Sequence, residues 1–93
     1  MVEKVATYRF SNRFKKEYAG LPKEVQEAFD KKFRLLLNNP HHPSLRVKKI
    51  KGTENRWEGS VTMNYRFTFQ IFNDTVLFRR IGTHDLLNRE QKE

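Results

Sequence analysis

Hydrophobic spacing divides the chain into a helical first half and a second half made of strands. The segment from Lys23 to Asn38 repeats apolar residues at intervals of three and four, which predicts an amphipathic helix. Those apolar residues are Val25, Ala28, Phe29, Phe33, Leu36 and Leu37. A shorter helix is predicted from Ser11, a good N-cap, to Tyr18, after a β-leaning segment from Val5 to Phe10. Gly20-Leu21-Pro22 separates the two helices, so we expect a helical hairpin.

Alternation of apolar and polar residues in the second half predicts four short strands. They span Arg46 to Lys51, Arg56 to Val61, Tyr65 to Phe72 and Val76 to Ile81. One face of this sheet is apolar and packs on the helices, while the other face carries polar side chains. We expect Glu58, Ser60 and Arg66 on that other face.

The faces of the first and last strands stay open at this point, since Lys48 falls in step with Ile50 and Arg79 with Ile81. The pattern as a whole predicts an α+β fold. In it, an N-terminal strand and a two-helix hairpin pack on a mainly antiparallel four-stranded sheet. The length of 93 residues, with no internal repeat or linker, predicts a single domain spanning residues 1–93.

Charge gives the first indication of function. Lys plus Arg number 19 against 11 acids, a formal net charge of +8 with a pI near 10.1. A small basic domain of this kind typically binds a polyanion such as nucleic acid, an anionic membrane or an acidic protein. The absence of cysteine excludes a disulfide scaffold, a thiolate metal site and a cysteine nucleophile. The longest apolar run is three leucines and no signal sequence is present, so we expect a cytoplasmic protein without a membrane span.

Cationic side chains concentrate in the half that is predicted to form strands. They are Arg46, Lys48, Lys49, Lys51, Arg56, Arg66, Arg79 and Arg80, against the three acids Glu54, Glu58 and Asp74. Clustered cations on a sheet are typical of a site for a phosphate backbone. The alternative is a solvated surface that only keeps the protein in solution.

Few residues outside this basic group suggest chemistry. His84 follows the last strand and precedes Asp85. A loop histidine beside an acid titrates in the range that proton transfer requires, and the alternative is a turn histidine that bonds the local backbone. His41-His42 is a poor chelating pair with no third ligand nearby in sequence, so we predict no metal site.

Two further kinds of side chain are open to more than one interpretation. Phe72 and Phe78 belong to the core or, at a sheet end, to a platform on which bases stack. Glu58 is the acid expected on the polar face, where its alternative is an ion pair with Arg66 or a neighbouring lysine.

The order of the elements and several short motifs resemble the RelE/ParE toxin superfamily of bacterial and archaeal toxin–antitoxin systems. The matching segments are Leu21-Pro22-Lys23, Asn39 to Arg46, Lys49 to Gly52, Trp57 to Val61, Tyr65-Arg66-Phe67 and Ile81 to Asp85. Each motif is short, but their order and spacing extend over residues 5–88. The closing Gly82-Thr83-His84-Asp85 is more similar to the YafQ-type mRNA interferase branch than to the ParE branch.

The resemblance implies a type II toxin that cleaves mRNA in the A site of the 70S ribosome, without a metal or other cofactor. In such toxins a ribose 2′-OH attacks the adjacent phosphate, which needs a base, cations for the phosphorane and an acid for the leaving oxygen. By position, Arg66 matches the phosphate-stabilising arginine and His84 the catalytic histidine, here the candidate general acid. Lys48 stands where YafQ-like members have a histidine, and an ordinary lysine is a poor base at neutral pH. The base is therefore Glu58 or an unusual lysine, Lys48 or Lys49, or else electrostatics carry most of the rate.

Three more positions depart from the YafQ-like pattern. Ser60 and Asn64 fall near a family histidine and aspartate, and Asn88 falls where an aromatic usually stacks on a base. We expect all three to contact RNA. The departures keep two alternatives open: a catalytically weak homologue that only binds RNA or protein, and a ParE-like inhibitor of DNA gyrase.

Every toxin interpretation implies a cognate antitoxin, acidic and folding on the toxin. The expected docking places are an apolar groove beside the helical hairpin and an edge of the sheet. No membrane and no small-molecule cofactor is expected as a partner.

Overall fold

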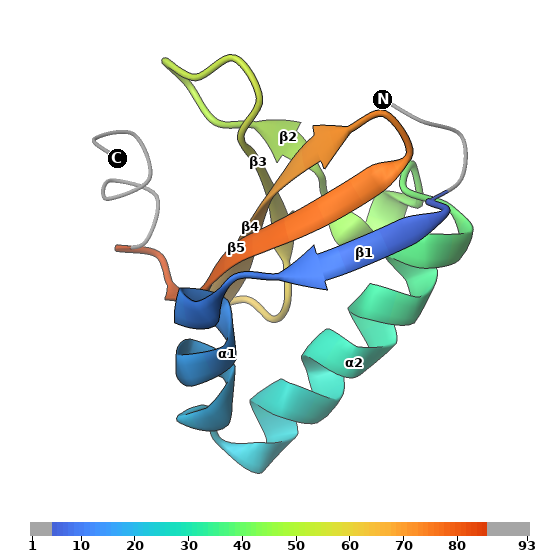
Figure 1. Cartoon of the computed structure of the whole chain (residues 1–93). Coiled ribbons are helices and arrows are strands. Elements are labelled where there is room, and N and C mark those ends of the chain that lie inside the picture. The colour runs from blue at the N-terminus through green and yellow to red at the C-terminus, as the bar shows by residue number, and fades with distance from the viewer. Residues whose placement is uncertain (1–4, 86–93) are drawn as a thin grey trace.

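The computed structural model describes residues 5–85, which fold as two helices against one sheet (Figure 1). The elements are β1 (Thr7–Phe10), α1 (Asn12–Ala19), α2 (Lys23–Asn38), the 3-10 turn η1 (Pro43–Leu45), β2 (Lys48–Lys49), β3 (Trp57–Ser60), β4 (Tyr65–Phe72) and β5 (Thr75–Thr83). The strands are ordered β1-β5-β4-β3-β2. β1 runs parallel to β5, and the other three pairings are antiparallel. The predicted α+β, mainly antiparallel architecture is confirmed, with the N-terminal strand added as a fifth strand of the sheet.

The helices begin and pack as their sequence pattern predicts. Ser11 is the N-cap of α1, because its Oγ accepts a hydrogen bond from the Phe14 N–H at 3.0 Å. The predicted apolar stripe of α2 is confirmed, since Val25, Phe29 and Leu36 are its buried residues. In Figure 1 α1 lies below the strands, and α2 runs along their lower right side. Aromatic side chains from both helices and from the sheet belong to one hydrophobic core. The ring of Phe29 lies 5.3 Å from that of Phe14 in α1.

A glycine in β3 makes room for a buried phenylalanine ring of β4. Gly59 pairs with Phe67 of β4, and a Cβ built on Gly59 would lie 2.3 Å from the Phe67 ring. Phe67 is fully buried and packs edge-on against Phe29. The two strands therefore depend on the missing side chain at position 59 for their spacing.

β5 contains a β-bulge that the sequence did not indicate. Thr68 and Phe69 are consecutive in β4, yet their partners Arg80 and Phe78 are separated by one residue, Arg79. The extra residue shifts the alternation of β5 by one position. The bulge decides which face each residue near the end of the last strand occupies: Ile81 faces the core, and Arg80 lies opposite Thr68.

α1 covers the edge of β5 where β1 stops. β1 ends at Phe10, opposite Phe78, and beyond that point the carboxylate of Glu17 supplies the acceptor that a strand would. Glu17 Oε1 accepts from the Ile81 N–H at 3.2 Å, and Oε2 lies 2.7 Å from Nη2 of Arg80. An edge whose N–H groups are used in this way is not available for pairing with another strand.

The segment before β3 differs most from its prediction. The strand predicted from Arg46 to Lys51 is limited to Lys48–Lys49. Arg46 adopts a left-handed conformation with φ 48° at the end of η1, and Gly52 has φ 83° in the turn after β2. These two backbone turns leave room for only two paired residues.

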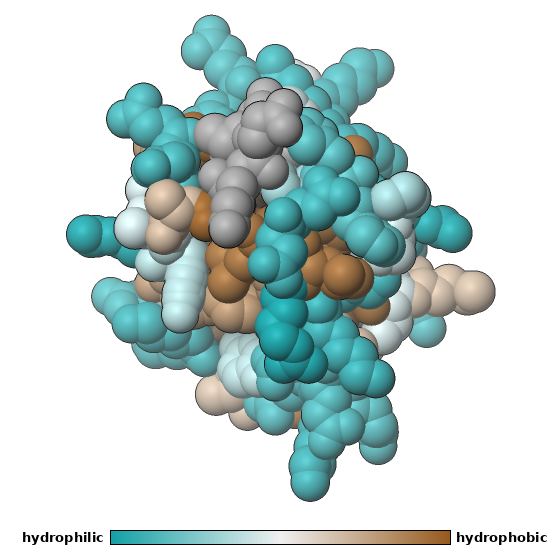
Figure 2. Space-filling model, turned by 90° about the vertical axis from the view of Figure 1, so that its right-hand side faces the viewer, coloured by the Kyte–Doolittle hydropathy of each residue, from teal (hydrophilic) through white to brown (hydrophobic). Residues whose placement is uncertain are grey.

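The surface on the α2 side is mostly hydrophilic, with an apolar area near its centre (Figure 2). Within residues 5–85, neither helix combines the length and the apolar character needed to cross a bilayer.

Candidate nucleic-acid interface

The sheet face turned away from the helices gathers polar residues from three strands. Lys48 pairs with Glu58, Glu58 with Thr68, and Ser60 with Arg66. Residues directly opposite one another in antiparallel strands share a face. We call these five residues the outer face. The structure thus brings together Glu58, Ser60 and Arg66 as the sequence predicts, and adds Lys48, whose face was open.

Glu58 is the unusual member of the outer face. Only 3% of its surface is exposed, and its Oε1 lies 3.0 Å from Nζ of Lys48. Among the described residues its other oxygen, Oε2, is buried without a hydrogen-bond partner. An unsatisfied buried acceptor costs about 1–3 kcal/mol. Glu58 therefore makes the ion pair with a neighbouring lysine that was one of its two interpretations, and its second oxygen takes no part in that pair.

Arg66 is held by the turn between β3 and β4. Its Nη1 donates to the carbonyl oxygens of Thr62, Met63 and Tyr65 at 2.5, 3.0 and 2.9 Å. Ser60 Oγ also donates to the Thr62 carbonyl, at 3.3 Å. These contacts to Nη1 fix the plane of the guanidinium, so a phosphate would meet the N–H groups on the other nitrogens of Arg66.

His84 lies at the same end of the sheet as Arg66. β5 ends at Thr83, opposite Tyr65, and Gly82 pairs with Arg66, so His84 follows directly beyond that corner. His84 is exposed in a turn, as predicted. The candidate acid and the candidate phosphate ligand therefore lie on the neighbouring ends of β4 and β5.

The predicted cations do not all share one surface. Lys48 and Arg66 belong to the outer face, whereas Lys49 pairs with Trp57 and so lies on the helix side of the sheet. Arg46 is exposed at the end of η1. Arg80 is 6% exposed and paired with Glu17, which favours a structural role for it.

The remaining predicted RNA-binding residues occupy loops or the β4–β5 region. Arg79 donates from Nη1 to Oε1 of Gln70 at 3.1 Å. Lys51 is exposed in the turn after β2, Asn64 is exposed in the turn before β4, and Arg56 is half-buried ahead of β3. Asn88 lies outside the described residues.

Of the two phenylalanines considered for base stacking, one is excluded. Phe78 is fully buried beneath the helices, so its interpretation as a stacking platform is wrong. Phe72 is 51% exposed at the end of β4. In the part of the chain that the structure describes, no group of three His, Cys, Asp or Glu side chains is placed to hold a metal ion.

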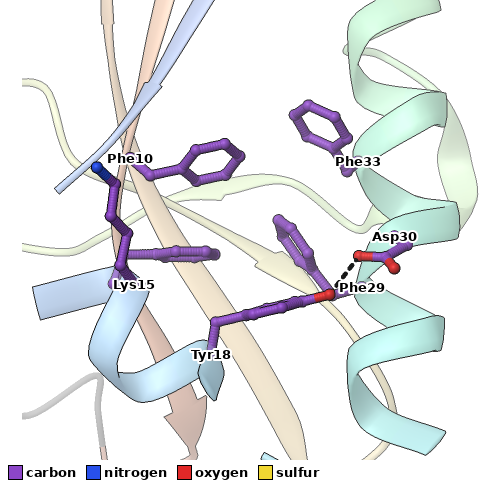
Figure 3. A pocket seen from close by; sticks show the side chains of 7 residues that line it. Phe10, Lys15, Tyr18, Phe29, Asp30 and Phe33 are labelled. Atoms are coloured by element: carbon purple, nitrogen blue, oxygen red, sulfur yellow. Dashed lines mark hydrogen bonds between the residues drawn. The ribbon is translucent and has the colours of Figure 1, made fainter. Parts of the chain in front are cut away.

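An apolar groove opens between α1, α2 and β1, with a volume of about 270 Å³ (Figure 3). It is lined by Phe10, Phe14, Lys15, Tyr18, Phe29, Asp30 and Phe33. The Tyr18 hydroxyl donates to Oδ1 of Asp30 at 2.8 Å, as the dashed line shows. Burial raises the pKa of Tyr18, and the hydrogen bond to Asp30 and its negative charge raise it further.

Solved structures with this architecture are numerous. No family model and no curated protein matches the sequence. A chain of the RelB-RelE antitoxin-toxin complex from Methanococcus jannaschii is 23% identical with a TM-score of 0.72, over 87% of this chain and 95% of that one. In the E. coli DinJ-YafQ toxin-antitoxin complex the values are 16% and 0.74, over 92% and 98%. This chain has the RelE-like fold.

A third example with the RelE-like fold comes from the RelBE2 toxin-antitoxin complex of Mycobacterium tuberculosis. It is 18% identical with a TM-score of 0.73, and the likeness covers 89% of this chain and 95% of that one. All three neighbours come from crystal structures of toxin-antitoxin complexes. At such identities the likeness concerns the fold.

Proposed function

We propose that this protein is the toxin of a type II toxin–antitoxin system and cleaves mRNA bound in the ribosomal A site. The observation that carries the proposal is the outer face, where a buried carboxylate with an unused oxygen stands among cations on a sheet of RelE-like topology. Messenger and ribosomal RNA are polyanions, so they are suitable partners in the cytoplasm for a protein of net charge +8.

Each residue has a role in metal-independent cleavage. Glu58 accepts the proton of the 2′-OH through Oε2, while Oε1 stays on Lys48. Arg66, fixed by its turn, and the exposed ammonium of Lys48 stabilise the charge on the phosphorane. His84 gives its proton to the leaving 5′-oxygen. The new P–O bond to the 2′ oxygen balances the broken bond to the 5′ oxygen, so the products are a 2′,3′-cyclic phosphate and a free 5′-hydroxyl.

In this proposal, Ser60 and Asn64 lie beside the scissile phosphate. Ser60 precedes the turn that holds Arg66, and Asn64 is exposed within that turn. Neither side chain transfers protons readily at neutral pH, so we assign to them hydrogen bonds to RNA and not acid–base chemistry.

The cleavage proposal is tested on purified ribosomes programmed with a defined mRNA, with cut positions mapped by primer extension. His84→Ala lowers the single-turnover rate by about 10²–10⁴-fold if it is the general acid. Arg66→Ala lowers it by about 10²–10³-fold, as the loss of a charge-stabilising donor does. The matched control is Arg34→Ala, an exposed arginine of α2 far along the chain from the outer face, which leaves the rate unchanged.

Three outcomes would contradict the proposal. Translation that stops while mRNA stays intact points to binding without cleavage. Inhibition of supercoiling by purified DNA gyrase at stoichiometric protein points to a ParE-like inhibitor. Equal cleavage rates for the wild type, His84→Ala and Arg66→Ala would show that these residues take no part in the reaction.

We also propose that an acidic antitoxin docks in the apolar groove between α1 and α2. Its five aromatic rings offer a place for apolar side chains of a peptide that folds on binding. Phe33→Glu, at the groove, abolishes co-purification with the protein encoded by the adjacent reading frame, whereas Arg34→Glu, one residue along α2 and exposed, preserves it. Equal recovery with both variants would exclude the groove.

A further inference from the structure

A second cavity lies on the helix side of the sheet, between the loop after α2 and the start of β3. Its volume is about 420 Å³, and His41, His42, Arg46 and Trp57 line it together with Pro40, Pro43 and Val47. Trp57 is two residues from Gly59 in β3 and so shares the face that packs on Phe67. The cavity is therefore on the opposite side of the sheet from the outer face.

The loop that forms the cavity wall is closed by its own backbone. The His42 N–H donates to the Asn39 carbonyl at 3.0 Å, and the Arg46 N–H donates to the Pro43 carbonyl at 3.1 Å. Arg46 adopts φ 48°, a left-handed conformation that is strained for a residue with a side chain. Two prolines and these bonds hold the cavity wall before any ligand arrives.

The side chains in this wall have defined hydrogen-bonding roles. Nδ1 of His42 accepts from the Ser44 N–H at 3.2 Å and lies 2.9 Å from the Ser44 hydroxyl. The neutral imidazole therefore carries its proton on Nε2, where it serves as a donor. The indole N–H of Trp57 donates to Asn55 Oδ1 at 3.2 Å, so Trp57 offers the cavity its ring and not its N–H.

The charge around the cavity is of one sign. Residues 39–51, which include the cavity wall, contain no Asp or Glu, and their four cations are Arg46, Lys48, Lys49 and Lys51. Lys49 pairs with Trp57 on the same face, and within residues 5–85 Arg46 forms no ion pair. A ligand for this cavity is therefore an anion with a flat ring.

We propose that this cavity binds one nucleotide of single-stranded RNA, with its base against Trp57 and its phosphate on Arg46. Aromatic rings with adjacent cations are the combination by which proteins hold single-stranded RNA. The inference rests on the proposed function, since both name RNA as the ligand. It adds a separate anchoring subsite on the other side of the sheet from the scissile bond.

Trp57 is the single tryptophan of the chain, so its fluorescence reports on the cavity directly. Titration with a hexaribonucleotide, without ribosomes, quenches the emission to saturation. Arg46→Gln raises the dissociation constant about tenfold and reduces the salt slope by about 0.7, the value for one lost phosphate contact on a single strand. Lys31→Gln removes the same charge from an exposed site on α2 and leaves the constant within twofold.

His42→Asn tests the ring itself, because asparagine keeps an acceptor for the Ser44 N–H. We expect a dissociation constant raised three- to fivefold with an unchanged melting temperature. Trp57→Leu is followed by anisotropy of a fluorescein-labelled hexaribonucleotide, and we expect binding weakened at least fivefold. Circular dichroism confirms that each variant is folded.

Several results would overturn this inference while leaving cleavage untouched. One is a wild-type protein that cuts mRNA but shows no quenching. Equal quenching by inorganic phosphate alone would make the cavity a plain anion site, and equal quenching by polyglutamate would make it a site for an acidic protein. Arg66→Ala is expected to lose cleavage and keep the quenching, so loss of both in that variant would also overturn it.

Discussion

The ion pair between the buried Glu58 and the exposed Lys48 predicts an asymmetry between two substitutions. Lys48→Met removes the cation but leaves the carboxylate 3% exposed with nothing to balance it. Glu58→Met removes the buried charge and leaves a lysine whose side chain is 70% exposed, which water solvates readily. The first change destabilises the fold, and the second stabilises it.

The magnitudes follow from the exposure of each partner. Breaking a fully buried ion pair costs about 3–5 kcal/mol. Because Lys48 is largely in water, its attraction for Glu58 is screened, and we expect Lys48→Met to lower the free energy of unfolding by about 1–2 kcal/mol. Removing a carboxylate whose Oε2 has no partner relieves a penalty of about 1–3 kcal/mol, so Glu58→Met gains about 1–2 kcal/mol.

Urea unfolding followed by far-ultraviolet circular dichroism measures both changes, with the double variant completing the cycle. Cleavage on programmed ribosomes is measured in parallel, and Glu58→Met loses activity although it is the more stable protein. A loss of activity with a gain in stability cannot be ascribed to unfolding. If Glu58→Met is destabilised as much as Lys48→Met, the carboxylate is a structural partner and the reasoning fails.

The other predictions concern the fold. Gly59→Ala forces the Phe67 ring to move and lowers the free energy of unfolding by about 1–3 kcal/mol in urea titrations, and Phe67→Leu in the same chain restores part of it. Because the pKa of Tyr18 is raised above 10.0, the stabilising contribution of its hydroxyl is complete below pH 10 and is lost as the pH rises through the raised value. The melting temperature of Tyr18→Phe should therefore fall less between pH 9 and pH 11 than that of the wild type. An equal fall would contradict a stabilising role for the hydroxyl. Ser11→Ala loses the N-cap of α1 and costs about 1 kcal/mol, and a change below 0.3 kcal/mol would count against the cap.

Much of the fold follows from local sequence because its signals are local. The apolar stripe of α2 and the Ser11 cap depend on residues within one or two turns of the helix. The bulge at Arg79 does not, since it depends on which residues β4 places opposite β5. The same holds for Arg46, whose left-handed backbone is set by the turn around η1. Neither the bulge nor the left-handed backbone of Arg46 can be predicted from a strand pattern of period two.

The candidate site was only partly within reach of the sequence. Alternation places Glu58, Ser60 and Arg66 on one face, and the structure agrees. The alternation does not predict the burial of Glu58 or its ion pair with Lys48, because both depend on the register between β2 and β3. An apolar groove beside the helical hairpin was expected, whereas the Trp57 cavity was not, since it depends on how the loop after α2 lies against β3.

The bulge at Arg79 also governs how this sequence is aligned with others. Deleting that one residue would leave a regular ladder in which Phe78 and Ile81 keep the core and Arg80 keeps the opposite face. The strand therefore tolerates the deletion of one residue at this position. A deletion elsewhere in β5 would move the core side chains beyond it to the opposite face of the sheet. A homologue with a straight strand here is one residue shorter. An alignment without a gap at Arg79 would match core residues of one protein with surface residues of the other on at least one side of the bulge.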